Sequence, residues 1–233
     1  MKSKYYSISQ EARIADVYIF GDITAYAWPE YGEVSASSFK DEIAALDVDV
    51  INVHINSYGG SVSEGWAIYN ALRDHKAKVV TRADGFVASA ALYPFMAGDE
   101  RIASNLSAFF FHQVMESVYG NADMLREAAD EADKLNEIGL AAFSNAGIDT
   151  ETVLALEKAE TWLSAAEALE YGIATAVIPD AAAKQTQSVK RDIIRQILKS
   201  AKKDASPSES VEREKKTDEK PVNSIETLLC GLF

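Results

Sequence analysis

Short apolar runs alternate with amphipathic stretches between Ala15 and Pro179. Runs rich in β-branched and apolar residues, which predict strands, lie at 15–21, 47–56, 78–84, 100–114 and 174–178. Stretches with helical spacing of apolar residues lie between them, at 38–46, 61–75, 87–98, 122–146 and 164–171. This alternation is typical of βα units stacked on a mostly parallel sheet, so the pattern predicts an α/β fold.

Polar residues and one glycine at the ends of two predicted helices agree with this interpretation. Ser38 with Asp41, and Ser164 with Glu167, have the spacing of a capping box, and Gly172 lies where a helix commonly ends. We therefore expect helices to begin at Ser38 and at Ser164.

The pattern changes after Pro179. Residues 184–220 hold eleven Lys and Arg against seven Asp and Glu, a balance of +4 in a chain whose formal net charge is −13. The segment is polar and rich in turn residues, and a short apolar stretch follows at 222–233. The sequence predicts one domain over 1–180 and a charged, flexible C-terminal extension with an apolar end over 181–233.

Composition narrows the function classes. Of 233 residues, 48% are hydrophobic, enough for one substantial core. We find neither the roughly 18 uncharged apolar residues of a membrane span nor the apolar run of a signal peptide, so we expect a cytoplasmic protein without a membrane partner. The net charge of −13 argues against a nucleic-acid partner. One cysteine, Cys230, and three widely spaced histidines argue against a metal site.

Three short motifs are candidates for chemistry, and each has a plain structural interpretation when taken alone. Gly59 and Gly60 join a strand to a helix, and such a turn exposes backbone N–H groups that stabilise negative charge. Ser89 lies where a strand turns into a helix, a place that exposes a hydroxyl, with the Ala90 N–H as an oxyanion donor. His112 ends an apolar strand and has the side chain best suited to accept a proton at neutral pH.

An isolated glycine pair is usually a tight turn, a serine among alanines usually packs, and a lone histidine on a strand is usually a hydrogen-bonded core residue. We assign that last role to His54, which lies mid-strand, and interpret His75 as a solvated helix end. The three motifs occur together and in order: a strand, the glycine pair and a helix; then a strand, the serine and a helix; then a strand that ends in the histidine. This combination favours a catalytic site over three separate structural features.

Three stretches in this order resemble the ClpP peptidases: INSYGGSVSEGWAIYNAL at 55–72, GFVASAALYPFMAGDERIASNLSAFFFHQ at 85–113 and ETWLSAAEALEYGIA at 160–174. The similarity runs from about Val17 to about Ile178. It implies the ClpP/crotonase-type spiral of ββα units, with a protruding handle helix within 122–146. It also implies homo-oligomeric rings, as single or stacked double rings, and protein or peptide substrates.

The resemblance implies a role for each matching residue. Ser89 matches the nucleophile, His112 the general base, and the backbone N–H groups of Gly60 and Ala90 the oxyanion hole. Glu160 stands where the family has the Asp of the triad; Asp149 and Glu157 are the other carboxylates we consider for that position. Tyr58 stands in place of a usual proline and is expected to alter the peptide-binding edge. This mechanism of acyl transfer needs no cofactor.

Within the family, the chain most resembles the head maturation proteases of phages and prophages, on the basis of Tyr58, the Glu160 motif and the charged extension. Such enzymes cleave scaffold and capsid proteins. The alternatives are a cellular ClpP-like peptidase fed by an AAA+ ATPase, a crotonase-type acyl-CoA enzyme using a glutamate such as Glu64, and an inactive assembly scaffold.

Overall fold

The computed structural model describes residues 6–24 and 36–179. The predicted C-terminal extension, 181–233, lies outside the described residues. The strands are β1 (Tyr6–Glu11), β2 (Ile14–Phe20), β3 (Val50–Ser57), β4 (Lys78–Ala88), β5 (Glu100–Ser104), β6 (Ala108–Phe110), β7 (Trp162–Ser164) and β8 (Ala176–Ile178). The helices are α1 (Ala36–Ala44), α2 (Val62–Arg73), α3 (Leu92–Met96), α4 (Ala122–Ser144), α5 (Thr150–Lys158) and α6 (Ala165–Glu170), with a 3₁₀ turn at Ser89–Ala91.

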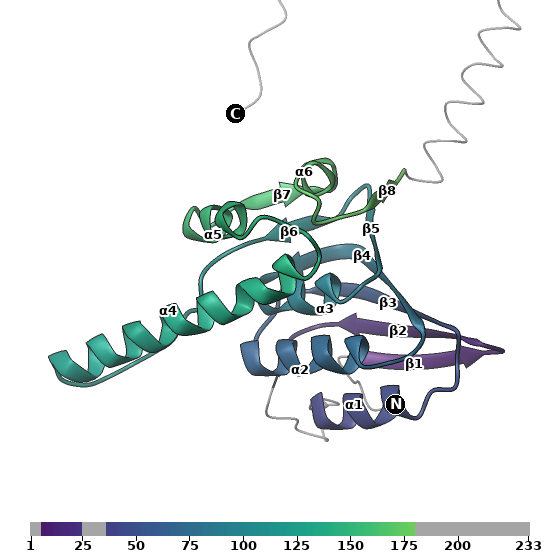
Figure 1. Cartoon of the computed structure of the whole chain (residues 1–233), viewed down its shortest axis with the longest axis horizontal. Helices are drawn as coiled ribbons and strands as arrows, with labels where there is room; N and C mark the ends of the chain where they lie inside the picture. Colours follow the sequence, from purple (N-terminus) through teal and green to yellow (C-terminus); the bar gives the residue numbers. More distant parts are fainter. Residues whose placement is uncertain (1–5, 25–35, 180–233) are drawn as a thin grey trace, which may run out of the picture. The chain divides into compact units, whose positions relative to one another are not determined.

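The sheet is mostly parallel, as the pattern predicts (Figure 1). Its strand order is β1-β2-β3-β4-β5-β8, and β6 pairs with both β4 and β7. Only the β1–β2 and β6–β7 pairs are antiparallel within the described residues. The end of β4 therefore lies beside β6. This pairing brings the segment that leads into Ser89 next to the segment that leads toward His112.

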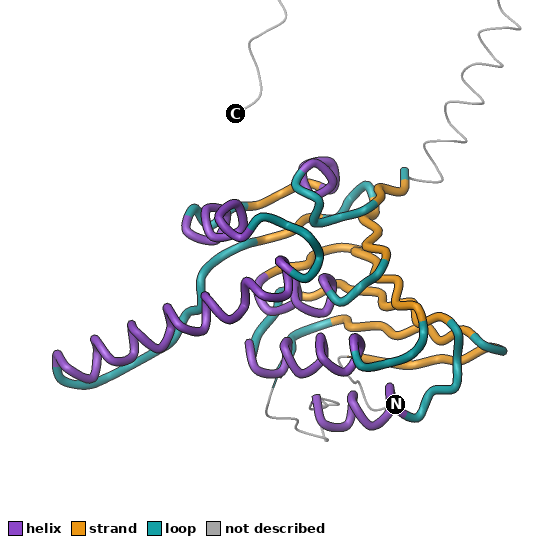
Figure 2. The backbone as a smooth tube through the Cα atoms, viewed as in Figure 1, coloured by secondary structure: helices purple, strands orange, loops and turns teal. Residues whose placement is uncertain are grey.

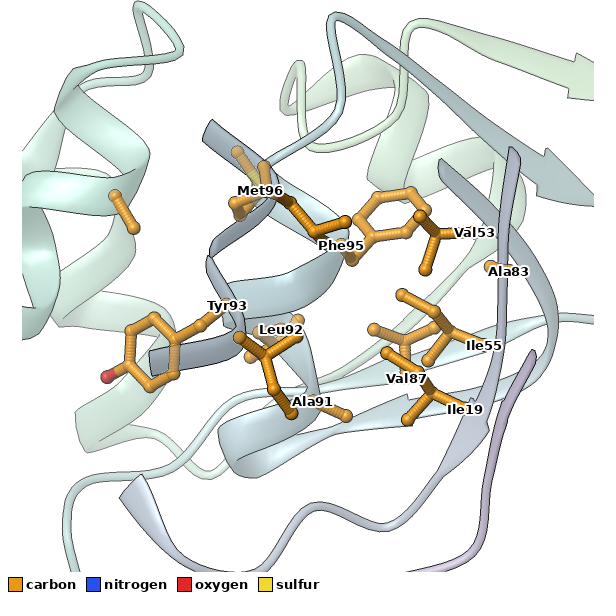
Figure 3. Close-up of a cluster of buried hydrophobic side chains, with 14 of the residues drawn as sticks. Ile19, Val53, Ile55, Ala83, Val87, Ala91, Leu92, Tyr93, Phe95 and Met96 are labelled. Carbon is orange, nitrogen blue, oxygen red and sulfur yellow. The ribbon is translucent and has the colours of Figure 1, made fainter. Parts of the chain in front are cut away.

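One face of the sheet carries the core. Along β3, Ile51, Val53 and Ile55 are buried, while the alternate residues are at least partly accessible. Helices α1, α2 and α3 lie against the buried face (Figure 1). Figure 3 shows strand side chains such as Val53 and Ile55 directed toward Phe95 of α3. The core fixes the helical segment that follows Ser89 against the sheet.

Helix α4 projects away from the sheet, and the loop after β6 runs along it (Figures 1 and 2). It begins at Asn121, whose side chain accepts the backbone N–H groups of Asp123 and Met124. Only its C-terminal half is buried, at Asn136, Gly139, Ala142 and Phe143. This is the protruding helix that the family resemblance implies.

Three boundaries differ from the sequence expectation. The predicted strand 100–114 is two strands, because Leu106 lies in a turn closed by Ser107 N–H donating to Ser104 O. Strand β4 continues to Ala88, so the predicted helix 87–98 begins only after it. Helix α1 begins at Ala36, so the expected start at Ser38 is wrong. The capping box at Ser164 and the left-handed Gly172, with φ of 72°, are confirmed.

Three elements have no counterpart in the sequence expectation: β1, α5 and the short strand β7. Strand β1 forms an antiparallel hairpin with β2, although its residues are mostly exposed. Helix α5 begins at Asp149, whose carboxylate accepts the Thr152 N–H at 2.8 Å. None of the helices in 6–24 and 36–179 has the length and apolar character to span a bilayer.

Candidate active site

The turn at Ser89 is strained. Ser89 has φ of 54°, and among the described non-glycine residues only Ala12, Ser89 and Glu160 have positive φ. A side chain in this region of backbone space costs on the order of 1–3 kcal/mol and persists where the surroundings enforce it. Ala90 and Ala91, which follow Ser89, are buried in the core and hold the turn in place. Ser89 itself remains partly exposed.

The glycine pair packs against this turn. Gly59 has φ of 93°, and a Cβ there would lie 2.6 Å from Ala88 O and 2.8 Å from Ala90 N. Gly60 has φ of 136° and forms a parallel bridge with Ile23. Neither position accepts a side chain without displacing backbone. The glycines are therefore required to bring the loop after β3 against the Ser89 turn.

One cavity of about 150 Å³ brings four of the predicted residues together. Gly60, Ser89, Ala90 and His112 all line it, although they come from separate segments of the chain. The remaining lining residues are Val62, Leu92, Tyr93, Gln113, Val114, Met115, Asn136 and Phe143. The predicted nucleophile, base and backbone donors thus share one small, partly apolar cavity at the base of α4.

The His112 ring has a fixed partner. Its Nδ1 lies 2.6 Å from the backbone oxygen of Gln113. Since a carbonyl oxygen only accepts, Nδ1 carries the hydrogen, and in the neutral ring Nε2 keeps its lone pair. In the described residues no hydrogen bond joins Ser89 to the ring, and such bonds often tighten only with substrate bound. The ring is in the tautomer that a general base requires.

Glu160 lies next to the end of the strand pair that precedes His112. Phe110 pairs with Trp162, and the Phe111 N–H donates to Thr161 O at 3.0 Å, so His112 and Glu160 are the residues that directly adjoin the paired ends of the two segments. Glu160 has φ of 48° where the chain leaves α5. Its side chain is exposed, and within the described residues it makes no hydrogen bond to the ring. Glu160 is placed beside the site rather than in the cavity.

The other two carboxylates have different surroundings. Asp149 caps α5, and its hydrogen bonds from Thr152 lower the pKa of the carboxyl. Glu157 is buried, and burial raises its pKa to about 7. Its Oε2 has no hydrogen-bond partner in the described structure. Asp149 therefore serves as the cap of helix α5. The burial of Glu157 favours its protonated, uncharged form.

The remaining histidines do not reach this cavity. His54 faces away from the core, where its Nδ1 lies 2.6 Å from Asp84 and its ring stacks on Tyr18 at 4.6 Å. It is hydrogen-bonded, as expected, but the expectation of a core position is wrong because β3 presents that side to the open face of the sheet. His75 is part-buried and contacts Leu46 O at 3.1 Å, rather than being a solvated helix end.

Tyr58 lies in a row of aromatic side chains beside the site. It is 63% exposed and stacks on Phe86 at 4.8 Å. Phe86 contacts Trp162 at 5.7 Å, and Trp162 stacks on Phe110 at 4.5 Å. Each of these residues lies within three positions of a candidate site residue. The replacement at Tyr58 therefore changes an apolar surface directly next to the Ser89 turn.

The sequence interpretation missed Asn136. It is only 8% exposed and lines the cavity. A signal was present, because Asn136, Gly139 and Phe143 share one face of a long amphipathic helix whose other polar residues lie elsewhere.

Among the described residues, no three His, Cys, Asp or Glu side chains gather in a group able to hold a metal ion.

Comparison with known families decides the relationship. The family model described as Clp protease matches residues 33–181. The chain belongs to the Clp protease family. One relative of this Clp-family chain is the ATP-dependent Clp protease proteolytic subunit 3 of Rhizobium meliloti, 30% identical over 165 residues, covering 70% of this chain and 82% of the relative. Another is the proteolytic subunit of Bacteroides thetaiotaomicron, 34% identical over 153 residues, 63% of this chain and 70% of the relative.

A solved structure confirms the fold. A mutant of ClpP1 from Listeria monocytogenes superposes with a TM-score of 0.57 and 24% sequence identity, covering 71% of this Clp-family chain and 92% of that chain. The matching family model spans the glycine pair, the Ser89 turn, His112 and helix α4. The ClpP-type spiral expected from the sequence is confirmed.

Proposed function

We propose that this chain is a serine peptidase of the Clp type with Ser89 as nucleophile. The observation that carries the proposal is the strained Ser89 turn, whose hydroxyl lines the same cavity as His112. Backbone strain of this kind accumulates at functional sites, since a stable core must hold it. Membership of the Clp protease family supports the same assignment.

In the proposed mechanism, Nε2 of His112 takes the Ser89 proton while Oγ forms a bond to a peptide carbonyl carbon. The N–H groups of Gly60 and Ala90 hold the resulting oxyanion, and each such donor contributes about 2.7–4 kcal/mol to lowering the barrier. The C–N bond then breaks, and His112 gives its proton to the departing amine. Water hydrolyses the acyl-enzyme by the same two steps.

We assign Glu160 as the carboxylate of the triad. Its position directly next to the paired segment that ends at Phe111 and Thr161, one residue before His112, supports this role. A carboxylate there stabilises the imidazolium that forms when the ring takes the serine proton. Glu160 is one methylene longer than the family Asp, and the role requires its side chain to turn toward the ring from the exposed position that it has in this structure.

Peptide cleavage tests this proposal. The assembled protein should hydrolyse a mixture of fluorogenic peptides, and Ser89→Ala should abolish turnover. Ser117→Ala is the matched control, because Ser117 is an exposed serine on the loop along α4. Loss of activity in the Ser117 variant, or unchanged activity in the Ser89 variant, would contradict the assignment.

The crotonase alternative would use Glu64 after the first oxyanion loop. Glu64 accepts the Ala36 N–H at 2.5 Å at the start of α1, and the described cavity does not include it. This contact favours the peptidase over the hydratase. Measurable hydration of crotonyl-CoA without proteolysis would reverse the choice, and an assembled protein with neither activity would indicate a scaffold.

We further propose a cytoplasmic homo-oligomeric ring that cleaves scaffold or capsid proteins during phage prohead maturation. Exposed apolar residues near the tip of α4, namely Val118, Tyr119, Met124 and Leu125, support contacts between copies. Tyr58 and Glu160 support the phage subfamily over a peptidase that works with an AAA+ ATPase. Co-expression with the scaffold and major capsid proteins of a tailed phage tests this: ordered cleavage without an ATPase is expected, and cleavage only with a Clp ATPase would contradict it.

A further inference from the structure

A single peptide group links His112 to α4. The carbonyl of the Gln113–Val114 peptide accepts the His112 Nδ1–H, with Nδ1 and O 2.6 Å apart. The N–H of the same peptide donates to Asn136 Oδ1 at 2.7 Å. Because the peptide group is planar and its C=O and N–H point in opposite directions, holding one end fixes the other. The ring, the peptide and the Asn136 amide form one chain of hydrogen bonds.

The burial of Asn136 restricts the motion of this series of hydrogen bonds. Asn136 is 8% exposed and lies on the packed half of α4, so its amide has little freedom to rotate. The N–H bond also assigns the amide: the oxygen faces Val114, since a backbone N–H only donates. Donation of the N–H polarises the peptide and makes its carbonyl a stronger acceptor for the ring.

This chain of hydrogen bonds decides which nitrogen of the neutral His112 ring carries the hydrogen. The neutral imidazole of histidine in water favours hydrogen on Nε2, which would leave no base toward Ser89. The Gln113 carbonyl reverses this preference by accepting from Nδ1. Glu160 makes no hydrogen bond to the ring in the described structure, so the tautomer depends on the Gln113 carbonyl, while the Phe110 ring packs against the imidazole at 5.4 Å.

We propose that Asn136 is a positioning residue for catalysis, which holds the Gln113–Val114 peptide so that its carbonyl keeps His112 in the Nδ1–H tautomer. This role rests on the proposed peptidase function. It differs from the role of Glu160, which acts on the charged ring after proton transfer. It also couples the base to α4, since Asn136 belongs to that helix.

Kinetics provide the first test. Asn136→Leu keeps the side-chain size and removes the acceptor, so kcat should fall about 10- to 100-fold with KM nearly unchanged, as expected when a reacting group is misplaced. Asn136→Asp keeps an acceptor oxygen and should restore kcat to within about fivefold of the parent. Asp133→Asn, an exposed change on the same helix, is the control. Full activity in Asn136→Leu, or no rescue by Asn136→Asp in folded protein, would overturn the proposal.

The decisive experiment reads the tautomer directly and does not need activity. Magic-angle-spinning ¹⁵N spectra of histidine-labelled protein contain three residues, and His54→Gln and His75→Gln assign two of them. The His112 ring should show a protonated Nδ1 and a bare Nε2, and Asn136→Leu should shift it toward the Nε2–H form. An Nε2–H ring in the parent, or an Nδ1–H ring unchanged in the variant, would overturn the inference. If Asn136→Leu shows the expected change of tautomer but the parent protein cleaves no peptide, the effect of Asn136 on the ring stands and the proposed peptidase function is rejected.

Discussion

Two histidines, His54 in β3 and His112 just after β6, differ in what surrounds them. On the open face, His54 has a carboxylate partner, Asp84, at 2.6 Å. On the cavity side, His112 has only a backbone carbonyl at 2.6 Å, but it shares a cavity with a strained serine. The histidine that pairs with a carboxylate, His54, is thus not the histidine that lies near the candidate nucleophile.

The comparison teaches that the position of the nucleophile defines this site. A histidine–aspartate pair is common where strands present polar residues to solvent, and its contribution to stability is small. The cavity side instead needs two left-handed glycines, a left-handed serine and small buried residues in one place. The glycines adopt these angles without steric strain, whereas the left-handed serine has a conformational cost that the fold must offset.

The histidines give the largest expected contrast. His112→Gln should lower kcat/KM by about 10⁴-fold or more, because the general base is lost. His54→Gln should leave it within about threefold, since only a surface hydrogen bond changes. Steady-state cleavage of one fluorogenic peptide by both variants measures the contrast. Comparable losses would show that the open face takes part in catalysis.

The glycine loop gives the next effect. Gly59→Ala should lower the free energy of unfolding by about 2–4 kcal/mol, from left-handed strain and from overpacking against the Ser89 turn. Gly147→Ala is matched to it, since Gly147 has φ of 80° but a Cβ there would meet no atom of the described structure within 4 Å. It should cost only about 1 kcal/mol. Urea unfolding of both variants measures the difference, and equal losses would mean that the contact at the turn is unimportant.

Glu157, which is buried in α5, gives a pH-dependent effect on stability. Burial raises its folded pKa to about 7 from 4.5, so the folded protein holds this proton more tightly than the unfolded chain does. As pH rises from about 4.5 to 7, the unfolded chain ionises first, and stability should fall by up to about 3 kcal/mol.

Glu157→Gln should remove that part of the pH dependence, so its stability should exceed the parent's more at pH 8 than at pH 4.5. Thermal unfolding across this range measures it. Curves that remain parallel at every pH would show that Glu157 ionises without a penalty.

The open face gives the smallest effect. Asp84→Asn removes the charge beside His54, and the side chains of both residues remain partly accessible to solvent. We expect a change of less than about 1 kcal/mol in the free energy of unfolding at neutral pH and no change in peptide cleavage. Urea unfolding at low and high salt checks this. A loss of several kcal/mol would mean that another copy of the chain covers this face.

The parts of the fold that follow local patterns could be predicted from the sequence. Apolar alternation located β3, β4 and the long helix α4, and the capping residues located α6. The break between β5 and β6 could not, because apolar residues continue through the turn at Leu106. Helix α5 was also missed, although Asp149 is an ordinary N-cap.

The site was predictable to the extent that its residues lie within short motifs. Gly60, Ser89, Ala90 and His112 follow from motif order and family resemblance, and the structure brings them to one cavity. The helix pattern could have placed Asn136 on the buried face of α4, but not its role, because its contact to Val114 joins residues 22 positions apart through a backbone group that no side-chain pattern reveals.

The central claim is that Ser89 is the nucleophile. Peptide mapping after reaction of the assembled protein with a fluorophosphonate probe tests it most directly. We predict one adduct, on Ser89 within the tryptic peptide 83–101, and its loss in His112→Gln. An adduct on another serine, or no adduct on folded and assembled protein, would contradict the account.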